Sequence, residues 1–407
     1  MRVLLITDSY PPEIRSASLL MAEMARALQD RGFEVGVLTS TPRYNLSRWP
    51  SKGTKRLFYR ERIKGIEVLR IHTLPIHNVG HIRRGVGQLL LPGMFALPSF
   101  FLKKPDAAII YSPPLTLGLA AYFMKMLRGT RIIFNVQDIF PQNAIDLGAL
   151  RDPRLIRAFR KIESFIYRHA DFITVHSAAN QDSLVAAGAP AGKIKVIPNW
   201  VDTSLYREKT GPVPLEDPSL LAGKFTVLFA GVMGYAQDLE IVLDAAEILK
   251  DRDDILFLLV GGGSERKKLE GLVARKGLRQ VVFHPFVQLE RYPDLVRAVD
   301  CGLVTLRKTM KTPVVPSKIL GYMAAGIPVI GTLNPQSEGI GIIEDSGGGI
   351  AAGIESAREL AESIRSLADD REKAREMGRR GKAFIEKHFS LDSCLGRYGQ
   401  LLRDLEA

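Results

Sequence analysis

The stretch VPSKILGYMAAGIPVIGT, from Val315 to Thr332, has the pattern of a helix start, a helix that ends at glycine, and a buried strand. Pro316 ends the preceding segment, Ser317 is a candidate N-cap, and Lys318 falls in the first helical turn. A cation at that position opposes the helix dipole and weakens the helix. The lysine becomes favourable if a diphosphate binds at the helix start, where backbone N–H groups are free. We therefore predict a phosphate site at Ser317 and Lys318.

The same alternation of strand and helix patterns runs along the whole chain. Apolar runs occur at residues 2–7, 34–39, 107–111, 131–136 and 171–177, and again at 225–231, 255–263, 281–286, 301–306 and 327–332. Amphipathic stretches separate them. Continuous apolar runs between helices predict parallel sheets covered on both faces. The predicted fold class is therefore α/β, with two Rossmann-like doubly wound domains that face each other across a cleft.

A proline-rich connector, REKTGPVPLEDPSL at 207–220, separates the two series of runs. We expect an N-terminal domain over residues 1–200, a linker over 201–218 and a second domain over 219–386. The remaining residues, 387–407, are predicted to form a helix that packs back on the N-terminal domain.

Composition limits the classes to which the chain can belong. The 407 residues are 46% hydrophobic and 25% charged, and the two cysteines, Cys301 and Cys394, have neither metal-ligand nor CxxC spacing. A disulfide framework or a zinc site is therefore not expected, and a reducing cytoplasm is favoured. The apolar run at the N-terminus is too short for a signal peptide and is interpreted as a buried first strand.

Positive charge is concentrated in the first half of the chain. Residues 1–200 hold 28 Lys and Arg against 14 Asp and Glu, whereas the remaining residues hold 28 against 30. Within that half, residues 51–104 hold 11 basic and 2 acidic residues. This excess of basic residues creates a positive electrostatic field, which attracts nucleic acid or an anionic membrane surface.

An apolar segment, GVGQLLLPGMFALPSFF, lies inside this basic region between Arg84 and Lys103. It is too short, and too interrupted by Pro92 and Pro98, to span a bilayer. One interpretation is a pair of core helices joined at the prolines. The other, which we favour, is a face that lies among lipid headgroups while the basic residues meet anionic lipid. The predicted membrane-binding residues are Arg83, Arg84, Leu89, Leu90, Phe95, Phe101, Lys103 and Lys104.

Three further motifs have a chemical and a purely structural interpretation. The glycines at Gly231 and Gly234, and again at 261–263, either admit a ligand to a helix start or only form tight turns. Asp138, at the end of an apolar run, is either a functional carboxylate or a helix cap. The acidic DRDD sequence at 251–254 is better explained as a helix-to-strand turn than as a metal site, so we expect no metal.

Eight motifs, among them VQDIFPQNA, FAGVMGYAQDLE, LVGGG and VPSKILGYMAAGIPVI, resemble those of glycosyltransferases of family 4, in the family's order and over nearly the whole chain. The chain looks closest to bacterial fucosaminyl-transferase-type enzymes of O-antigen or capsule synthesis. The resemblance implies the GT-B fold and a retaining, hexosyltransferase-type transfer without metal or cofactor. The implied partners are a nucleotide sugar, UDP-linked rather than GDP-linked, a polyprenyl-diphosphate-linked saccharide and the inner face of the cell membrane, and no nucleic acid.

The resemblance also implies a set of site residues. The base would lie near Pro285 to Val287, the diphosphate near the Gly231 turn and the start of the Ser317 helix, and the family's first loop would run from Glu13 to Ser18. We predict Lys318 as the catalytic cation and Asp138 as a group that positions the acceptor. The predicted donor-binding residues are Ile14, Arg15, Ser16, Gly231, Met233, Gly234, Gln237, Gly262, Pro285, Phe286, Val287, Pro316, Ser317, Gly321 and Tyr322.

The sequence departs from the family pattern at three places. Arg15 stands where a small residue is common, and Val232 and Gln237 stand where many relatives have Arg and Lys. Two glutamates of the family are replaced by Pro313 and Gly321, of which the second would bind ribose hydroxyls. Glu338 or Glu344 is expected to substitute for it, and Gly321→Glu is expected to tighten nucleotide binding. A sugar-nucleotide 2-epimerase that uses His284 and Glu338, or a catalytically weakened relative, remains an alternative.

Overall fold

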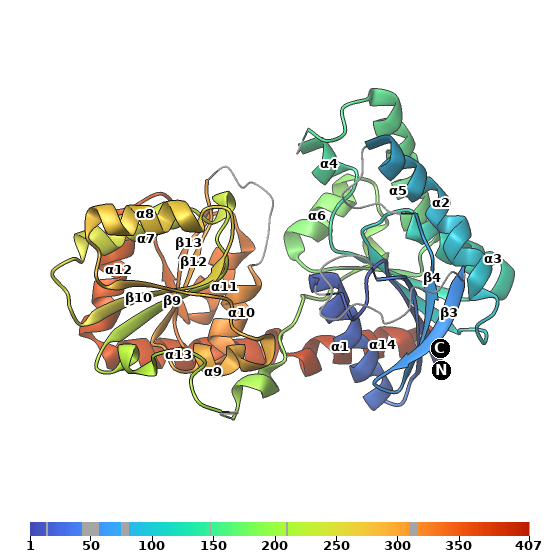
Figure 1. The fold of residues 1–407 in the computed structure, drawn as a ribbon. Helices are drawn as coiled ribbons and strands as arrows, with labels where there is room; N and C mark the ends of the chain where they lie inside the picture. The colour runs from blue at the N-terminus through green and yellow to red at the C-terminus, as the bar shows by residue number, and fades with distance from the viewer. Residues whose placement is uncertain are drawn as a thin grey trace. The chain divides into compact units, whose positions relative to one another are not determined.

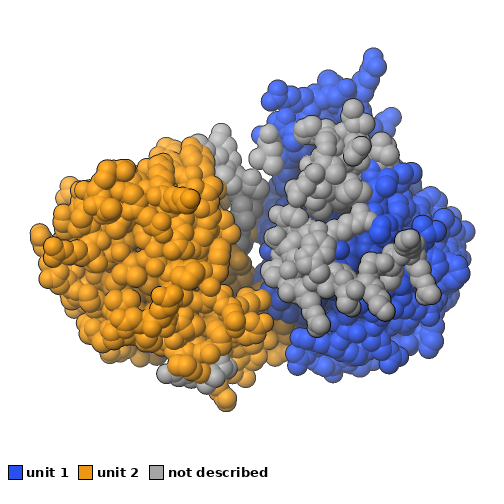
Figure 2. Space-filling model, in the orientation of Figure 1, with its two compact units in different colours: residues 1–199, 394–407 blue, residues 200–393 orange. Residues whose placement is uncertain are grey.

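The computed structural model describes residues 1–13, 15–42, 57–74, 81–146, 148–208, 211–308 and 316–406, without the side chains of 81–86, 88 and 89. The chain forms two compact units (Figures 1 and 2). Unit 1 comprises residues 1–199 and 394–407, and unit 2 comprises residues 200–393. Each unit contains one largely parallel sheet between helices, so the predicted α/β class with two Rossmann-like domains is confirmed.

Unit 1 is built on an eight-stranded sheet with the order β3-β4-β2-β1-β5-β6-β7-β8. All neighbouring strands are parallel except β3 and β4, which are antiparallel at one edge. The strands are β1 (Arg2–Ile6), β2 (Glu34–Ser40), β3 (Phe58–Ile63), β4 (Ile66–Ile71), β5 (Ala107–Ser112), β6 (Arg131–Val136), β7 (Phe172–Val175) and β8 (Ile194–Val196).

The helices of unit 1 cover both faces of this sheet, because successive strand residues point to opposite sides. Leu4 and Ile6 pack in one cluster with residues of α2, α3 and α5, whereas the intervening Leu5 is equally buried. The helices are α1 (Ser16–Asp30), α2 (His81–Ser99), α3 (Leu117–Arg128), α4 (Gln142–Asp146), α5 (Pro153–His169), α6 (Ala178–Ala186) and α14 (Leu391–Asp404).

The last helix, α14, returns to unit 1. Tyr398 of α14 accepts a hydrogen bond from Asn135 Nδ2 at 2.5 Å and donates one to Thr174 Oγ1 at 3.1 Å. Both partners lie on central strands, so a buried polar contact fixes the end of the chain to this sheet.

Unit 2 has a six-stranded sheet with the order β11-β10-β9-β12-β13-β14, in which all pairs are parallel. The strands are β9 (Phe225–Val232), β10 (Ile255–Gly262), β11 (Val281–His284), β12 (Cys301–Thr305), β13 (Val329–Thr332) and β14 (Gly349–Ala351). The helices are α7 (Leu239–Ile248), α8 (Arg266–Lys276), α9 (Tyr292–Val296), α10 (Ser317–Ala324), α11 (Glu338–Ser346), α12 (Ala357–Asp369) and α13 (Arg371–His388), with 3₁₀ turns η2 (Thr203–Tyr206) and η4 (Tyr235–Gln237).

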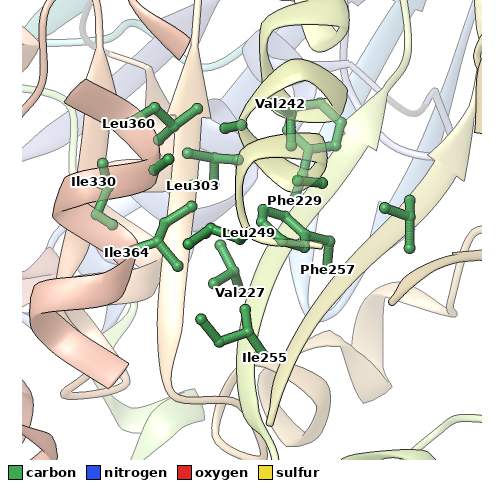
Figure 3. Packing of buried hydrophobic residues seen from close by; sticks show 14 of the residues in the cluster. Val227, Phe229, Val242, Leu249, Ile255, Phe257, Leu303, Ile330, Leu360 and Ile364 are labelled. Carbon is green, nitrogen blue, oxygen red and sulfur yellow. The ribbon is translucent and has the colours of Figure 1, made fainter. Parts of the chain in front are cut away.

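Two apolar cores lie on the two faces of this sheet. Val227 and Phe229 of β9 pack with Val242 of α7 and Leu360 of α12 (Figure 3). The alternate residues of β9, among them Leu228, pack with residues of α9, α10 and α11 in the second core. Strands buried on both faces produce the continuous apolar runs seen in the sequence.

The order of the strands reverses direction once in each sheet. In unit 1 the chain moves outward from β1 on one side and from β5 on the other, and in unit 2 it does so from β9 and β12. Open α/β sheets bind ligands at the carboxyl ends of the strands that flank such a switch point. A binding site is therefore expected at the carboxyl ends of β9 and β12 in unit 2 and of β1 and β5 in unit 1.

Candidate functional site

Two glycine turns lie against each other at the carboxyl ends of β9 and β10. Gly231 and Gly261 are opposite in the ladder, and a Cβ atom on Gly261 would lie 1.9 Å from the carbonyl oxygen of Gly231. A Cβ atom on Gly263 would lie 2.3 Å from the carbonyl oxygen of Met233. Gly261 and Gly263 are therefore required for backbone packing, which is the structural interpretation of that motif.

Gly231 has a different reason to be glycine. Its φ of 144° lies in the region that side chains disfavour, and a Cβ atom there would meet Lys318 Cε at 2.8 Å and Nζ at 3.0 Å. The absence of a side chain thus lets the lysine approach the end of β9. The structure brings together the two sequence motifs predicted to bind a diphosphate, although they lie far apart in the chain.

Lys318 is half-buried on the first turn of α10, with its ammonium 3.9 Å from the centroid of the Phe229 ring. Burial removes water from the ammonium and lowers the pKa of Lys318 to about 8. Within the described residues, no carboxylate forms an ion pair with it. A desolvated cation at a helix start costs stability, and this cost would be recovered only when an anion binds.

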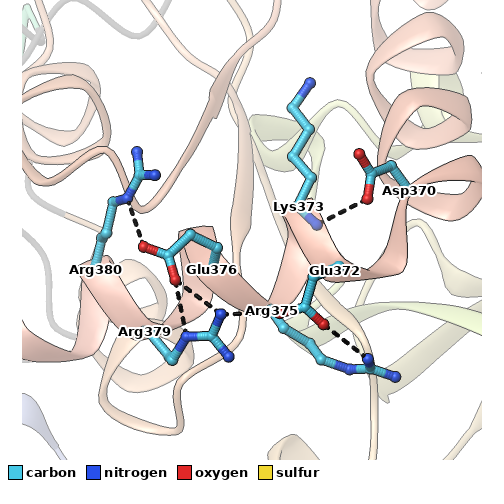
Figure 4. Close-up of polar contacts among 7 residues, drawn as sticks. All are labelled: Asp370, Glu372, Lys373, Arg375, Glu376, Arg379 and Arg380. Atoms are coloured by element: carbon cyan, nitrogen blue, oxygen red, sulfur yellow. Dashed lines mark hydrogen bonds and ion pairs between the residues drawn. The ribbon is translucent and has the colours of Figure 1, made fainter.

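The charged residues of α13 show the opposite arrangement (Figure 4). Arg379 donates hydrogen bonds to Glu372 and Glu376 at 2.9 Å, and Arg380 donates one to Glu376 at 3.1 Å. These guanidinium groups are exposed and neutralised within their own helix. Lys318 therefore differs from Arg379 and Arg380 in both its burial and its lack of a described carboxylate partner.

The start of α10 differs from the prediction in one detail. Pro316 occupies the N-cap position, where no side chain caps the helix, and the exposed Ser317 is the first helical residue. Ser317 is therefore not the N-cap. Its backbone N–H still belongs to the first turn, where helical amides have no partner within the helix.

Other predicted donor residues divide between the surface and the core. Pro285 and Phe286 are exposed after β11, and the Phe286 ring lies 3.3 Å from the place of a Cβ atom on Gly262. Gln237 folds back so that its Oε1 lies 3.2 Å from the place of a Cβ atom on Gly234. Val287 is partly buried and packs against the second core.

Two predicted donor side chains are corrected by their burial. Met233 and Tyr322 are fully buried, so neither side chain faces solvent. The amide of Met233 donates to the carbonyl of Gly262 at 2.8 Å, which leaves it unavailable to a ligand. Met233 directly follows the exposed Val232 at the end of β9, and Tyr322 lies among the buried residues of α10.

Gly321 faces packed tyrosines of its own unit. A Cβ atom at this position would lie 3.0 Å from the hydroxyl oxygen of Tyr206 and 3.9 Å from the ring of Tyr292. The glycine therefore makes room for Tyr206, whose contribution the sequence did not indicate. A glutamate here would have to displace that hydroxyl, which argues against the expected gain in nucleotide binding.

Of the two proposed substitutes for the missing glutamate, only Glu338 lies at the carboxyl edge of the sheet. It is the first residue of α11, directly after β13, and a Cβ atom on the next residue, Gly339, would lie 3.1 Å from Pro316. Glu344 is exposed near the other end of α11, about 9 Å farther along the helix axis.

Arg307, which sequence reasoning missed, fixes the turn that follows β9. Its Nε donates to the carbonyl of Tyr235 at 2.8 Å, and its guanidinium lies 4.2 Å from the centroid of the Tyr235 ring. It also pairs with Asp238 at 3.2 Å and with Glu240 at 3.3 Å. The sequence offered one signal for this role of Arg307, which is its position two residues after an apolar strand.

Arg252 and Asp254 confirm the interpretation of the DRDD sequence as a turn. The turn joins α7 to β10, and Arg252 donates hydrogen bonds to Asp254 at 2.7 and 2.8 Å. Asp254 directly precedes β10, at the opposite edge of the sheet from Lys318. Within the described ranges, no three His, Cys, Asp or Glu side chains gather in a metal-binding group.

In unit 1, the loop after β1 is held by charged side chains. Arg15, the residue before α1, pairs with the buried Asp8 at 3.6 Å. The fully buried Arg70 of β4 donates hydrogen bonds to the carbonyls of Pro11 and Ser40 and to Glu61. Ile14 lies outside the described residues, and Ser16 is the exposed first residue of α1.

Asp138 follows β6 at the same edge of unit 1. It keeps an exposed surface, yet partial burial raises the pKa of its carboxyl, while the nearby His176 lowers it. Its described hydrogen bond comes from the side chain of Asn143, at 3.4 Å. That contact is weak and is not a bond from a helix backbone, so it does not support the cap interpretation, and the functional interpretation stays a prediction.

Most of the predicted membrane segment belongs to one continuous helix, α2, which contains both prolines and ends at Ser99, before Phe101. Leu90 and Phe101 are exposed, as are Lys103 and Lys104, whereas Phe95 is fully buried in the core and is corrected to a packing residue. The side chains of Arg83, Arg84 and Leu89 lie outside the described part. Within the described residues, no helix is both long enough and apolar enough to cross a membrane.

Sequence models of known families match both units of the chain. The model described as glycosyl transferase 4-like domain matches residues 19–200, and the model described as glycosyl transferases group 1 matches residues 216–384. The Escherichia coli K12 protein WcaI, named as a colanic acid biosynthesis glycosyl transferase, is 25% identical over 90% of this chain and 91% of its own.

Solved structures share the fold over nearly the full chain. Anabaena HepE, solved in complex with UDP, is 19% identical and superposes with a TM-score of 0.71 over 99% of this chain and 100% of its own. Sucrose-phosphate synthase of Thermosynechococcus elongatus is 17% identical, with a TM-score of 0.71 over 99% of this chain and 98% of its own. The chain is a glycosyltransferase of family 4 with the GT-B fold.

Proposed function

We propose that the chain transfers a sugar from a nucleotide diphosphate, with UDP as the nucleotide, to a lipid-linked saccharide in the synthesis of a cell-surface polysaccharide. The transfer would retain the anomeric configuration and need no metal. The observation that carries this proposal is the desolvated ammonium of Lys318 beside the Gly231 turn. A cation held there, with the free amides of a helix start, has the chemistry of a diphosphate site.

The reaction needs help mainly at the leaving group. As the bond between the sugar and the phosphate breaks, negative charge grows on the diphosphate and positive charge on the sugar. Lys318 and the N-terminus of α10 would stabilise the growing negative charge, which is usually the largest catalytic contribution. The leaving phosphate would then take the proton of the acceptor hydroxyl, so no protein nucleophile is required.

The rest of the donor would lie along the carboxyl edge of unit 2. The exposed ring of Phe286 offers an apolar surface for the base, and Glu338 offers a carboxylate to the ribose hydroxyls. UDP is favoured because Anabaena HepE was solved with UDP and with UDP-glucose. An N-acetylated deoxyhexose is the sugar that the resemblance to fucosaminyl-transferase-type enzymes favours.

Unit 1 would bind the acceptor. Asp138 would orient the acceptor hydroxyl, and the colanic acid assignment in the name of WcaI supports an acceptor that belongs to a cell-surface polysaccharide. The resemblance to enzymes of O-antigen and capsule synthesis favours a repeat unit linked to polyprenyl diphosphate as the acceptor. Such an acceptor would bring the enzyme to the inner face of the membrane.

A surface on α2 and α3 fits such a membrane. Of the nineteen exposed large apolar side chains in the described residues, seven lie between residues 90 and 127. The two helices pack side by side (Figure 1), and Arg128 of α3 donates hydrogen bonds to the carbonyls of Ser99 and Leu102 at 2.7 and 3.0 Å. The seven residues are Leu90, Leu97, Phe100, Phe101, Phe123, Met126 and Leu127.

The segment that carries this surface is mainly basic. Residues 81–131 hold seven Lys and Arg and a single acidic residue, Asp106. Three of the seven form ion pairs outside the segment, Lys103 with Glu34 and both Lys125 and Arg131 with Asp171, which leaves a smaller positive excess. An apolar patch within such a field suits a bilayer that contains anionic lipid, where each basic residue near the surface contributes about 1 kcal/mol. This surface extends the predicted segment by a helix, α3, whose sequence was interpreted only as a sheet-covering helix.

The reaction is tested by incubating the protein with labelled UDP-sugars, with and without a polyprenyl-diphosphate-linked saccharide. We expect labelled lipid product only when the acceptor is present, with the anomeric configuration retained. An epimerised sugar nucleotide formed without acceptor would support the epimerase alternative and overturn the transferase proposal. Binding of UDP with no transfer to any acceptor would support a weakened relative.

Membrane binding is tested by sedimentation with vesicles of phosphatidylcholine and phosphatidylglycerol at low salt. Changing Leu97, Phe101 and Leu127 to serine should release the protein, and so should changing Lys103 and Lys104 to serine. Changing Ile248, an exposed residue of unit 2, to serine is the control. Failure of the wild-type protein to sediment would remove the membrane surface from the proposal without touching the reaction.

A further inference from the structure

The pairing between β9 and β12 ends early. The two strands pair only at Val227 with Cys301 and at Leu228 with Gly302. Beyond these positions β9 stays paired with β10, and β12 stays paired with β13. The strands therefore separate at the switch point of unit 2, where a ligand is expected.

The hydroxyl of Tyr322 occupies the place that β12 leaves. The amide of Ala230 donates a hydrogen bond to the Tyr322 hydroxyl oxygen at 3.1 Å. The ring lies directly on Gly302, because a Cβ atom there would be 2.2 Å from the Tyr322 Cδ2 atom. Tyr322 is fully buried, and burial raises the pKa of its hydroxyl well above the usual range. The hydroxyl therefore stays neutral, and its oxygen accepts the amide hydrogen while it keeps its own proton.

Helix α10 uses two residues on one face to contact three consecutive residues of β9. Lys318 and Tyr322 are four positions apart, so they lie one above the other on the helix. The ammonium of Lys318 lies over the ring of Phe229 and beside Gly231, and the hydroxyl of Tyr322 binds the amide of Ala230 between them. The helix that carries the cation thus also holds the backbone beside which the cation lies.

We propose that Tyr322 is a positioning residue for the donor diphosphate. Its hydroxyl replaces β12 as the partner of Ala230, keeps β9 and β12 apart, and fixes the Gly231 turn beside Lys318. This inference rests on the proposed function, in which that turn and that lysine bind the diphosphate. Tyr322 itself touches no ligand, since its side chain is fully buried.

The test compares Tyr322→Phe with wild type in calorimetric titrations with UDP. The change removes one oxygen atom and keeps the ring, so the core remains filled. Loss of a backbone hydrogen bond that positions the site should weaken UDP binding about 3- to 10-fold. Tyr167→Phe is the control, because Tyr167 is equally buried but donates its hydrogen bond to Glu163 in unit 1. It should lower the melting temperature and leave UDP affinity unchanged.

Hydrogen exchange distinguishes a local loss of the Tyr322 hydrogen bond from a general loss of stability. In Tyr322→Phe, exchange should accelerate in the peptide that covers residues 229–234 and not throughout unit 2. In the wild-type protein the same peptide should be protected before UDP is added, a result that needs no variant. Gly302→Ala, which forces the Tyr322 ring to move, should produce the same local change.

The outcomes separate the inference from the proposed function. If Tyr322→Phe binds UDP like the wild type and its 229–234 peptide exchanges normally, the inference is overturned and the function stands. If UDP binds the wild type and Lys318→Met equally, or binds neither, the proposed function is overturned and the inference with it.

Discussion

Replacing Lys318 by methionine should make unit 2 more stable and its nucleotide binding weaker. The pKa of Lys318 falls from 10.5 to about 8 on folding, and one pKa unit corresponds to about 1.4 kcal/mol, so the buried charge costs roughly 3 kcal/mol at pH 7. The contact with the Phe229 ring returns about 1 kcal/mol of this. Lys318→Met should therefore raise the free energy of unfolding by roughly 2 kcal/mol.

The stability gain should depend on pH in a defined direction. Between about pH 8 and 10.5 the unfolded lysine binds a proton that the folded lysine has lost. The stability of the wild type therefore rises with pH across this interval, and the advantage of Lys318→Met shrinks. Calorimetric unfolding at pH 7 and pH 9.5 measures both effects. Lys373→Met, a change at an exposed lysine of α13, is the control and should show no gain.

Ligand binding should move in the opposite direction. A charge-assisted hydrogen bond is worth about 1.5–3 kcal/mol, so Lys318→Met should weaken UDP binding about 10- to 100-fold. Turnover should fall further than affinity, because the departing diphosphate carries more negative charge in the transition state than in the bound donor. In the wild type, UDP affinity should fall as pH rises above about 8, where the free lysine loses its proton. A variant that is less stable at pH 7, or that binds UDP normally, would refute this account of Lys318.

Three further changes test neighbouring features. Gly321→Glu should destabilise unit 2 and leave UDP binding no tighter in calorimetry, because its Cβ atom would lie 3.0 Å from the Tyr206 hydroxyl. Val232→Arg, added to Lys318→Met, should recover part of the UDP affinity, since residue 232 is exposed beside Gly231 and an arginine there stays solvated. Tyr398→Phe should lower the stability of unit 1 in urea denaturation by about 1–3 kcal/mol, because two buried hydrogen-bond partners are left unsatisfied.

The sequence predicted the strands that appear as continuous apolar runs and missed β3, β4, β8 and β14. Apolar runs correctly marked β1, β2, β5, β6 and β7 in unit 1 and β9 to β13 in unit 2. The hairpin of β3 and β4 was missed because charged residues interrupt both strands: β3, FYRERI, lies at the edge and has three charged residues in a row, and β4, IEVLRI, contains a glutamate and an arginine. The strands β8 and β14 have three residues each, too few to form a pattern.

The sequence identified the segments that form the candidate site, but it could not show which way their side chains point. The motif around Lys318 identified a real helix start, yet it could not tell that Tyr322 faces the core while Lys318 faces the end of β9. Both residues lie on the face of α10 that packs on the sheet, so the distinction depends on how far along the helix each one lies: Lys318 in the first turn reaches the end of β9, and Tyr322 one turn later lies in the core. Gly321 was interpreted as a lost carboxylate because the contact that explains it, with Tyr206, joins distant parts of the chain.

The positive charge beside the Gly231 turn comes from α10 and not from the turn itself. This explains why Lys318 needs a glycine at position 231. Family members that carry an arginine or lysine after the first glycine bring the charge to the turn from within it. Here Val232 and Gln237 are neutral. The cation is Lys318 of α10, which occupies the space that a side chain on Gly231 would fill. Because α10 also anchors Ala230 through Tyr322, the cation and the turn are fixed by one rigid element. In the proposed function, a cation fixed beside the turn before the ligand arrives would lose little freedom on binding, which would favour catalysis by preorganised charge at the expense of stability.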